Sequence, residues 1–322
     1  MKRSILFLVL GLGFFSLPAF SQGADKCLSG DCKSGDGEMQ FANGDKWTGK
    51  FANGKPNGAG KYQFKAGMIF EGDFVGGRMG KSGKLTYANG DIYEGELKNS
   101  VLDGKGVMKY EKGGSYDGEW KGNKRNGIGK FDIYSKEKPL GVYTGRQVNN
   151  MMETLPNDTA TLVYANGNVY VGEFKNNKRH GKGKFTSGGN IYDGYFVEDK
   201  METAVAQTST LTFKNGDIYT GEFKEGKKIG KGKLIFANKD LYEGDFKDGK
   251  REGNGKLTYA SGDIYEGAFV ADAVTGKGTL KLIKGGVYEG DFVNGKFNGQ
   301  GTYTFPNGTK KTGKWVDGQF VP

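Results

Sequence analysis

Aromatic and glycine residues alternate with charged residues along most of the chain. In residues 240–262, DLYEGDFKDGKREGNGKLTYASG, the alternation places Tyr242, Gly244 and Phe246 on one face of an extended segment and acidic and basic side chains on the other. The run Gly-x-Gly-x-Leu-x-Tyr at residues 253–259 has the same two-faced pattern. Two such runs joined by turn residues predict an antiparallel β-hairpin with one face of rings and glycines and one face of charges.

The hairpin pattern recurs with a period of 23 residues in its regular parts. Turn signals of the Asn-Gly type, at residues 88–91 and 214–217, predict tight turns between the runs. We take the aromatic residue of each Tyr-x-Gly triplet as the anchor of its hairpin. The anchors are Trp47, Phe70, Tyr93, Tyr116, Tyr143, Tyr170, Tyr192, Tyr219, Tyr242, Tyr265 and Tyr288.

The units YVGEFKNNKRHGKGKF (170–185) and YEGDFKDGKREGNGKLTYASG (242–262) resemble MORN repeats. The resemblance covers nearly all of the chain after residue 34. It implies an all-β fold, an elongated single-layer solenoid of tandem antiparallel β-hairpins over residues 35–320. The hairpins near 143–213 depart from the pattern, because those starting at Tyr143 and Tyr192 lose the Gly-x-Gly pair.

Glycine is unusually frequent, with 58 residues in 322, and it accompanies 17 Tyr and 22 Phe. A disordered Gly-rich linker would lack such a number of rings. A glycine on the inner face leaves a gap that an aromatic ring can cover, and it allows a strand to bend and twist. We therefore expect each inner glycine to form a slot for a ring.

The N-terminal segment has the features of a secretory signal. Lys2 and Arg3 precede an apolar run, and small residues stand before a cleavage point after Ser21. We expect residues 1–21 to be a signal peptide and the protein to be exported, to the periplasm or the medium. A retained signal anchor is the alternative.

Residues 22–34 contain the two cysteines of the chain, Cys27 and Cys32. An oxidising compartment favours a disulfide between them, which would cap the first hairpin. Free thiols or half of a metal site are the alternatives. The chain has one histidine, so a zinc site of the usual composition cannot be assembled.

Motifs for catalysis are weak throughout. VGGRMGKS, residues 75–82, lacks the first glycine of a phosphate-binding loop and lies at an expected turn. His180 also lies at an expected turn, where a solvated side chain is the simpler interpretation. The sequence therefore predicts no catalytic, cofactor-binding or metal site and no enzyme, because no segment remains free for a catalytic domain.

Two charge ladders recur on the polar face: an acid three residues after most anchors, and a lysine after most of the Gly-x-Gly pairs. Neutralisation across strands explains them most simply, and recognition of a polyanion is the sharper alternative. The formal charge of +10 is modest and no basic run is present, so nucleic acid is not an expected partner.

The two irregular hairpins share the tripeptide Met-Glu-Thr. A structural function accounts for the residues of the regular units. We therefore expect the partner surface at the hairpins that depart from the pattern. The candidate residues are Met151, Met152, Glu153, Thr154, Met201, Glu202 and Thr203. The sequence thus predicts a non-enzymatic exported scaffold that binds a protein partner, associates with itself or supports envelope structure. The alternative is a peripheral binder of anionic phospholipid or of an envelope polyanion, with weak attachment to an anionic membrane surface.

Overall fold

The computed structural model describes residues 25–203 and 207–322, and in these ranges it contains 28 strands and no helix. The expected signal peptide, residues 1–21, lies outside the described residues. Contacts divide the chain into two compact units. Unit 1 is Met1–Thr154 with Leu162–Ala165, and unit 2 is Leu155–Thr161 with Asn166–Pro322.

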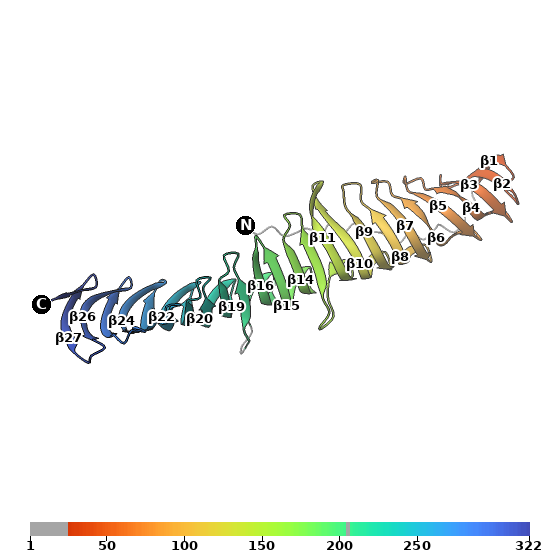
Figure 1. The fold of residues 1–322 in the computed structure, drawn as a ribbon. Coiled ribbons are helices and arrows are strands. Elements are labelled where there is room, and N and C mark those ends of the chain that lie inside the picture. Colours follow the sequence, from red (N-terminus) through yellow and green to blue (C-terminus); the bar gives the residue numbers. More distant parts are fainter. Residues whose placement is uncertain (1–24, 204–206) are drawn as a thin grey trace. The chain divides into compact units, whose positions relative to one another are not determined.

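Successive strands of unit 1 pair in antiparallel fashion with their neighbours in sequence (Figure 1). Its strands are β1 (Lys26–Gly30), β2 (Asp36–Gln40), β3 (Lys46–Ala52), β4 (Lys55–Gln63), β5 (Ile69–Val75), β6 (Arg78–Thr86), β7 (Ile92–Lys98), β8 (Val101–Lys109), β9 (Ser115–Lys121), β10 (Lys124–Ser135), β11 (Lys138–Val148) and β12 (Met151–Met152). Strand β13 (Ala160–Tyr164) has residues in both units.

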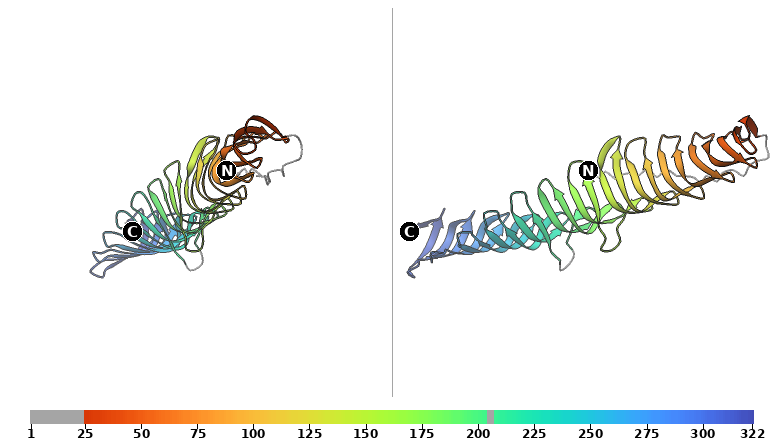
Figure 2. Two further views of the ribbon diagram at one scale, coloured as in Figure 1. Left: turned by 90° about the vertical axis from the view of Figure 1, so that its right-hand side faces the viewer. Right: turned by 45° about the vertical axis from the view of Figure 1, so that its right-hand side comes forward.

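Unit 2 has the same plan of tandem hairpins, and its strands bend visibly (Figure 2). Its strands are β14 (Val169–Lys175), β15 (Lys178–Ser187), β16 (Asn190–Val197), β17 (Lys200–Met201), β18 (Ser209–Thr212), β19 (Ile218–Lys224), β20 (Lys227–Ile235), β21 (Leu241–Lys247), β22 (Lys250–Thr258), β23 (Ile264–Val270), β24 (Ala273–Lys281), β25 (Val287–Val293), β26 (Lys296–Thr304), β27 (Lys310–Val316) and β28 (Gln319–Val321). The all-β array of antiparallel hairpins is confirmed.

The two turns of each repeat differ in kind. Inside a hairpin the turn has two residues, both with positive φ, as at Asn176 (50°) and Asn177 (65°), which is the type I′ geometry of tight hairpins. Between hairpins the turn is wider: Gly90 has φ 91° and donates to the Tyr87 carbonyl at 2.9 Å, while Asn89 keeps negative φ. The turn expected at residues 88–91 is present, but it is not the two-residue Asn-Gly turn. A three-residue loop closed by a glycine bulge stands there.

A bend in the first strand of each hairpin brings two rings together. Residues four apart in a straight strand are about 13 Å apart. The ring centroids of Tyr242 and Phe246 are nevertheless 5.3 Å apart and nearly perpendicular. The strand bends at Gly244, between them, so that the two rings close on each other. Most anchors also meet the corresponding ring of the next hairpin, as Tyr242 meets Phe269 at 4.8 Å, which makes a row of rings along the hairpins.

The anchor ring covers two glycines, as the sequence predicts. A Cβ on Gly244 would collide with the hydroxyl of Tyr242, and a Cβ on Gly255, on the paired strand, would collide with the ring itself. The hydroxyl also donates to the backbone carbonyl three residues ahead, from Tyr242 to Asp245 at 2.9 Å. The same hydrogen bond occurs at every tyrosine anchor from Tyr93 to Tyr288, with lengths from 2.6 to 3.1 Å. The indole nitrogen of Trp47 donates the equivalent hydrogen bond to the carbonyl three residues ahead.

The first glycine of each Gly-x-Gly has a different function from the second. Between the pairs Gly244–Gly255 and Phe246–Arg251 the register shifts, so that three residues of β22 oppose Asp245 alone. Gly253, in this bulge, has φ 73°, a conformation that favours glycine. The simple alternation expected through Gly253 is thus interrupted at the bulge.

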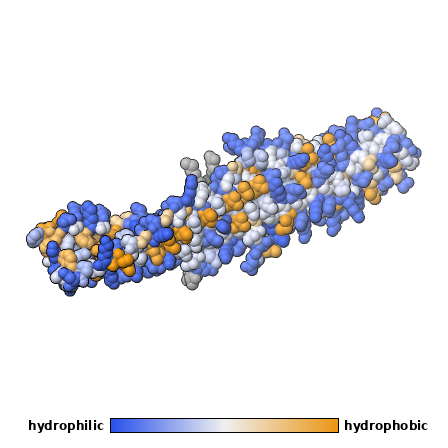
Figure 3. Space-filling view, viewed as in Figure 1, coloured by the Kyte–Doolittle hydropathy of each residue, from blue (hydrophilic) through white to orange (hydrophobic). Residues whose placement is uncertain are grey.

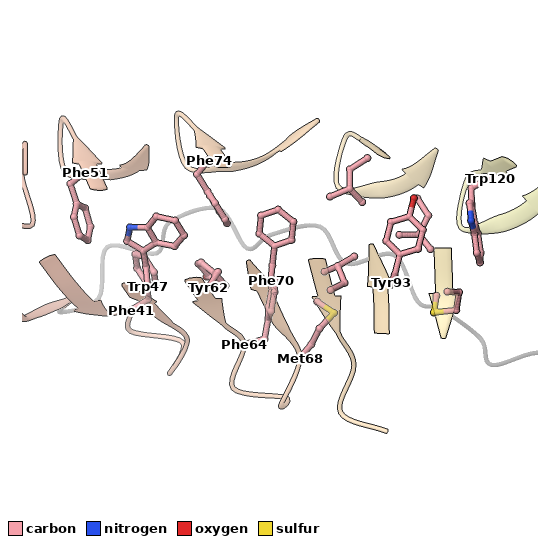
Figure 4. Packing of buried hydrophobic residues seen from close by; sticks show 14 of the residues in the cluster. Phe41, Trp47, Phe51, Tyr62, Phe64, Met68, Phe70, Phe74, Tyr93 and Trp120 are labelled. Atoms are coloured by element: carbon pink, nitrogen blue, oxygen red, sulfur yellow. The ribbon is translucent and has the colours of Figure 1, made fainter. Parts of the chain in front are cut away.

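The core of unit 1 is this row of rings, held between the two arms of the bent hairpins (Figure 4). Trp47 and Phe74 lie 4.5 Å apart, and Phe70 and Phe74 lie 5.5 Å apart. The row is broken at Gln147, which stands where regular hairpins have phenylalanine. Gln147 is 0% exposed, and its amide has no hydrogen-bond partner among the described residues.

Both ends of the array are capped. Cys27 and Cys32 form a disulfide that ties β1 to the turn before β2, as predicted. At the other end Lys311 replaces an anchor, and its ammonium group lies 5.7 Å from the ring centre of Phe320. Phe320 in turn packs on Trp315.

Replacing Gly244 by valine should lower the free energy of unfolding by about 1–3 kcal/mol, because the side chain would displace the Tyr242 hydroxyl from its carbonyl. Urea unfolding measures this loss. Lys256→Thr is the control, since it removes only an exposed ion pair and should change stability by less than about 1 kcal/mol. Equal stability of Gly244→Val and the parent would contradict the ring-slot geometry.

Replacing Gln147 by methionine should raise the free energy of unfolding by about 1 kcal/mol, because a side chain of similar shape no longer buries an amide without partners. Gln147→Ala, which leaves a cavity, should lower it. Thermal unfolding of both variants provides the comparison. A methionine variant less stable than the parent would show that the amide is hydrogen-bonded in solution.

Alkaline pH should unfold the protein through its anchors. Burial raises the pKa of Tyr116, Tyr242 and Tyr265 to about 12 each. The folded state thus holds protons that the unfolded chain loses near pH 10, so this stabilisation is complete below about pH 10 and is lost as pH rises toward 12. Urea unfolding at a series of pH values should show this decline. The decline should be shallower in Tyr242→Phe, and identical slopes would exclude the anchor as its source.

Candidate functional site

The two irregular hairpins carry extra residues at the position of the bulge. After the turn at Asn149 and Asn150, strand β12 ends at Met152 and β13 begins at Ala160. After the turn at Glu198 and Asp199, β17 ends at Met201 and β18 begins at Ser209. Residues 153–159 and 202–208, which we call insert 1 and insert 2, therefore replace the three-residue bulge. Residues 204–206 of insert 2 lie outside the described residues.

The methionines of the two Met-Glu-Thr tripeptides do not form an exposed apolar surface. Met152 is 5% exposed and opposes Gln147 in the strand register, and Met201 is half-buried and opposes Phe196. Met151, by contrast, is 36% exposed. Burial of Met152 follows from its position, because β12 continues the inward alternation of the hairpin before insert 1 begins.

The second tripeptide fastens insert 2 to the following hairpin. The Thr203 amide donates to the Phe223 carbonyl at 3.0 Å, and the Phe223 amide donates to the Thr203 hydroxyl at 2.9 Å. The carboxylate of Glu202 accepts the Glu225 amide at 3.0 Å, in the next turn. In the first tripeptide the Glu153 amide donates to the Arg146 carbonyl at 3.2 Å. Much of the tripeptide is therefore structural, and the outer parts of the inserts remain for a partner.

Strand register resolves the two charge ladders. The lysine after Gly-x-Gly opposes the acid directly after the next anchor, and Lys233–Glu243 and Lys256–Glu266 form ion pairs of 3.5 and 3.2 Å. The acid three residues after the anchor instead accepts a backbone amide of its own bulge, as Asp291 accepts from Gln300 at 2.9 Å. Hydrogen bonds from Lys277 and from this amide hold the pKa of Asp291 below its usual value. The lysine ladder is thus neutralised by the acids directly after the anchors, and the acid ladder stabilises the bulges.

The charge ladders are interrupted around insert 2. Thr208 and Thr210 stand where the next hairpin has Lys231 and Lys233. Thr220 stands where the hairpin starting at Tyr242 has Glu243. The Thr210 and Thr220 hydroxyls lie 3.4 Å apart, in place of an ion pair. Acids are also replaced at two further positions, by valine and tyrosine. We call this set the low-charge window; it comprises Val171, Tyr195, Thr208, Thr210 and Thr220.

Both inserts border the outer face of the hairpin that starts at Tyr170. A hollow of about 310 Å³ lies between Asn157–Thr159 of insert 1 and Lys182 and Lys184 of β15. A second hollow of about 470 Å³ lies between the same lysines and Thr208 of insert 2. All of these residues belong to unit 2. Elsewhere the visible surface is mostly hydrophilic, with scattered apolar residues (Figure 3).

No group of three or more His, Cys, Asp and Glu residues that could hold a metal ion occurs in residues 25–203 and 207–322. His180 lies half-exposed on β15, and its backbone carbonyl is a distant acceptor for the Tyr170 hydroxyl at 3.4 Å. Within the described ranges no helix is long and apolar enough to span a membrane.

The MORN repeat family matches eight segments that together make up more than half of the chain: residues 47–69, 70–92, 93–115, 116–135, 170–190, 219–241, 242–264 and 288–310. The irregular hairpins starting at Tyr143 and Tyr192 lie largely outside these segments. No curated protein sequence matches the chain.

Solved structures match it only distantly. The TCP10 domain of Danio rerio CPAP in complex with a peptide of Danio rerio STIL is 11% identical, with a TM-score of 0.30 over 86% of this chain and 98% of its own. The SAS-4 (dCPAP) TCP domain of Drosophila melanogaster, in complex with a proline-rich motif of Ana2, is 14% identical, with a TM-score of 0.26 over 72% of this chain and 88% of its own. Virginiamycin B lyase from Staphylococcus aureus has a TM-score of 0.13 at 11% identity, over 91% of this chain and 88% of its own. Scores this low carry no argument about function.

Proposed function

Because the chain belongs to the MORN repeat family, whose units are non-enzymatic repeats, we propose that it is an exported scaffold that binds a protein partner on the outer face of unit 2. The partner contacts the low-charge window and the outer parts of inserts 1 and 2. The remaining hairpins hold this surface in place.

The loss of charge between the two inserts carries the proposal. Protein interfaces are depleted of charged residues at their centre, enriched in tyrosine, and rimmed by polar groups. The low-charge window has fewer charges than the outer face of the regular hairpins, with Tyr195 half-exposed and Val171 41% exposed, and it retains Lys184 and Asp193. Ion-paired side chains such as Lys231 and Asp245, 2.6 Å apart, stand beside it and would form the rim. Insert 1 adds Leu155, which is 53% exposed.

Export is supported by the sequence of residues 1–21 and by the disulfide between Cys27 and Cys32. Disulfides persist in oxidising compartments and are rare in the cytosol. The proposal therefore places the mature protein in the periplasm or the medium.

A weak attachment to anionic lipid or to an envelope polyanion is the second candidate. The formal charge of +10, which becomes +8 without Lys2 and Arg3, favours it. The charge ladders weaken it, since ion pairs such as Lys61–Glu71 neutralise much of the outer face. Co-sedimentation with phosphatidylglycerol vesicles should therefore show binding that physiological salt abolishes.

Shortening both inserts should abolish capture of the partner. In the shortened protein, residues 153–159 and 202–208 are each replaced by Glu-Gly-Asn, the bulge of the hairpin starting at Tyr242. Ala160→Gly and Ser209→Gly restore the second glycine. The irregular segments 149–162 and 199–211 then have the regular pattern. The fold should persist although the shortened hairpins lack the acid three residues after the anchor. The regular hairpin starting at Tyr265 has Ala268 at that position and still forms the bulge. Pull-down from the native envelope fraction, followed by mass spectrometry, identifies the partners.

Lys61→Gln is the matched control, because it changes the outer face in unit 1, away from the inserts, and should leave capture unchanged. Circular dichroism and thermal unfolding verify that the shortened protein is folded. A folded, shortened protein that captures every partner of the parent would exclude the inserts as the binding site.

A further inference from the structure

Two lysines between the inserts have no ion-pair partner. Lys182 and Lys184 are both exposed on β15, and neither forms an ion pair with a described residue. Both line the hollow beside insert 1 and the hollow beside insert 2. They are therefore cationic groups without an ion pair in hollows that Asp158, Glu173 and Asp193 also line.

Several of the corresponding lysines of other hairpins are paired, whereas Lys84 and Lys105 oppose glutamates but form no ion pair with a described residue. Lys231, which corresponds to Lys182, lies 2.6 Å from Asp245, and Lys233, which corresponds to Lys184, lies 3.5 Å from Glu243. The same strand register therefore normally supplies each lysine with a carboxylate.

Three substitutions leave Lys182 and Lys184 unpaired. Tyr195 opposes Lys182 at the position of an acid, and Val171 opposes Lys184 from β14. Asp193 opposes Lys184 from β16, and the next hairpins have the longer glutamate at this position. Lys184 and Asp193 do not form an ion pair. The Glu173 carboxylate already accepts the Lys182 backbone amide at 3.2 Å.

We infer that Lys182 and Lys184 bind carboxylates of an extended acidic segment of the protein partner. This inference rests on the proposed function and specifies the chemistry of the partner. Residues two apart on a strand lie about 7 Å apart on one face, so the two ammonium groups match acids at alternate positions of an extended chain. The hydroxyls of Thr159 and Thr208, at the sides of the hollows, offer hydrogen bonds to the same segment.

An acidic peptide suits this place better than an anionic membrane. The lysines stand between Asn157–Thr159 on one side and Thr208 on the other, so a narrow chain can enter where a flat bilayer is held away. Asp158, Glu173 and Asp193 also line the hollows, and they repel a dense anionic surface more than they repel a segment with spaced acids.

The test compares two double variants of the mature protein. Lys182→Gln with Lys184→Gln removes the unpaired lysines, and Lys231→Gln with Lys233→Gln removes their ion-paired counterparts. Fluorescence anisotropy measures binding of a labelled peptide of alternating Glu and Ser, with a peptide of alternating Gln and Ser as the neutral control. Vesicles containing phosphatidylglycerol form a separate arm.

The acidic peptide should bind the parent and the Lys231/Lys233 variant alike, and should bind the Lys182/Lys184 variant about tenfold more weakly, as expected for two partly exposed ion pairs. The neutral peptide should bind all three proteins equally weakly. Equal binding of the acidic peptide by both variants, or no binding by the parent, overturns the inference. Vesicle binding that requires Lys182 and Lys184, without peptide binding, overturns it in favour of lipid.

Capture of native partners separates this inference from the proposed function. A Lys182/Lys184 variant that retains every partner, while the insert-shortened protein loses them, overturns the inference and leaves the proposed function standing. Retention of every partner by the insert-shortened protein overturns the proposed function itself.

Discussion

The bend of each first strand over its glycine is the constraint on which the rest of this structure depends. Without a side chain at Gly244, the strand folds back far enough for Tyr242 and Phe246 to meet, and the tyrosine ring covers the bare backbone. The hydroxyl then donates a hydrogen bond to the Asp245 carbonyl at the bend. One residue thus fills the core, protects the glycine and closes the bend. A single-layer sheet gains a core in this way, because its own two arms enclose the rings.

This constraint leaves little choice of residue type on the inner face of a hairpin and a wide choice on the outer face. An added Cβ at the inner glycines would collide with a ring or with the opposite backbone. Outer positions accept Glu, Lys, Val, Tyr or Thr without any change in strand register. Differences between hairpins can therefore accumulate on the outer face without loss of the fold. The low-charge window is such a difference, and its position beside both inserts is the reason to connect it with binding.

The sequence was sufficient to predict the hairpins, their anchors, the glycine slots and the Cys27–Cys32 pair, because each depends on spacing along the chain. It was insufficient wherever the outcome depends on strand register. The bulge places Asp245 against a backbone amide of its own hairpin, and this function of the acid ladder has no signature in alternation alone. The sequence pattern assigns no function to Arg179 and Arg251, yet their guanidinium groups lie over rings and bind Asp199 and Asp272 of the next turn. The partners of these arginines are about 20 residues away in sequence, so only the pairing of hairpins reveals them.

The position of the inserts follows from the same bend. The bulge is the one place in a hairpin where strand pairing is already interrupted, so extra residues can leave the sheet there without breaking further ladder hydrogen bonds. Met152 and Met201 then occupy the place at which Arg179 and Arg251 stand in regular hairpins, and the pairing on either side of the inserts is preserved. Ala160 and Ser209 replace the second glycine with small residues that the anchor ring still tolerates, as the 3.0 Å hydrogen bond between the Tyr192 and Ser209 hydroxyls shows. The irregular hairpins therefore carry their extra residues at the bulge of the repeat, and the strand pairing of the scaffold is preserved.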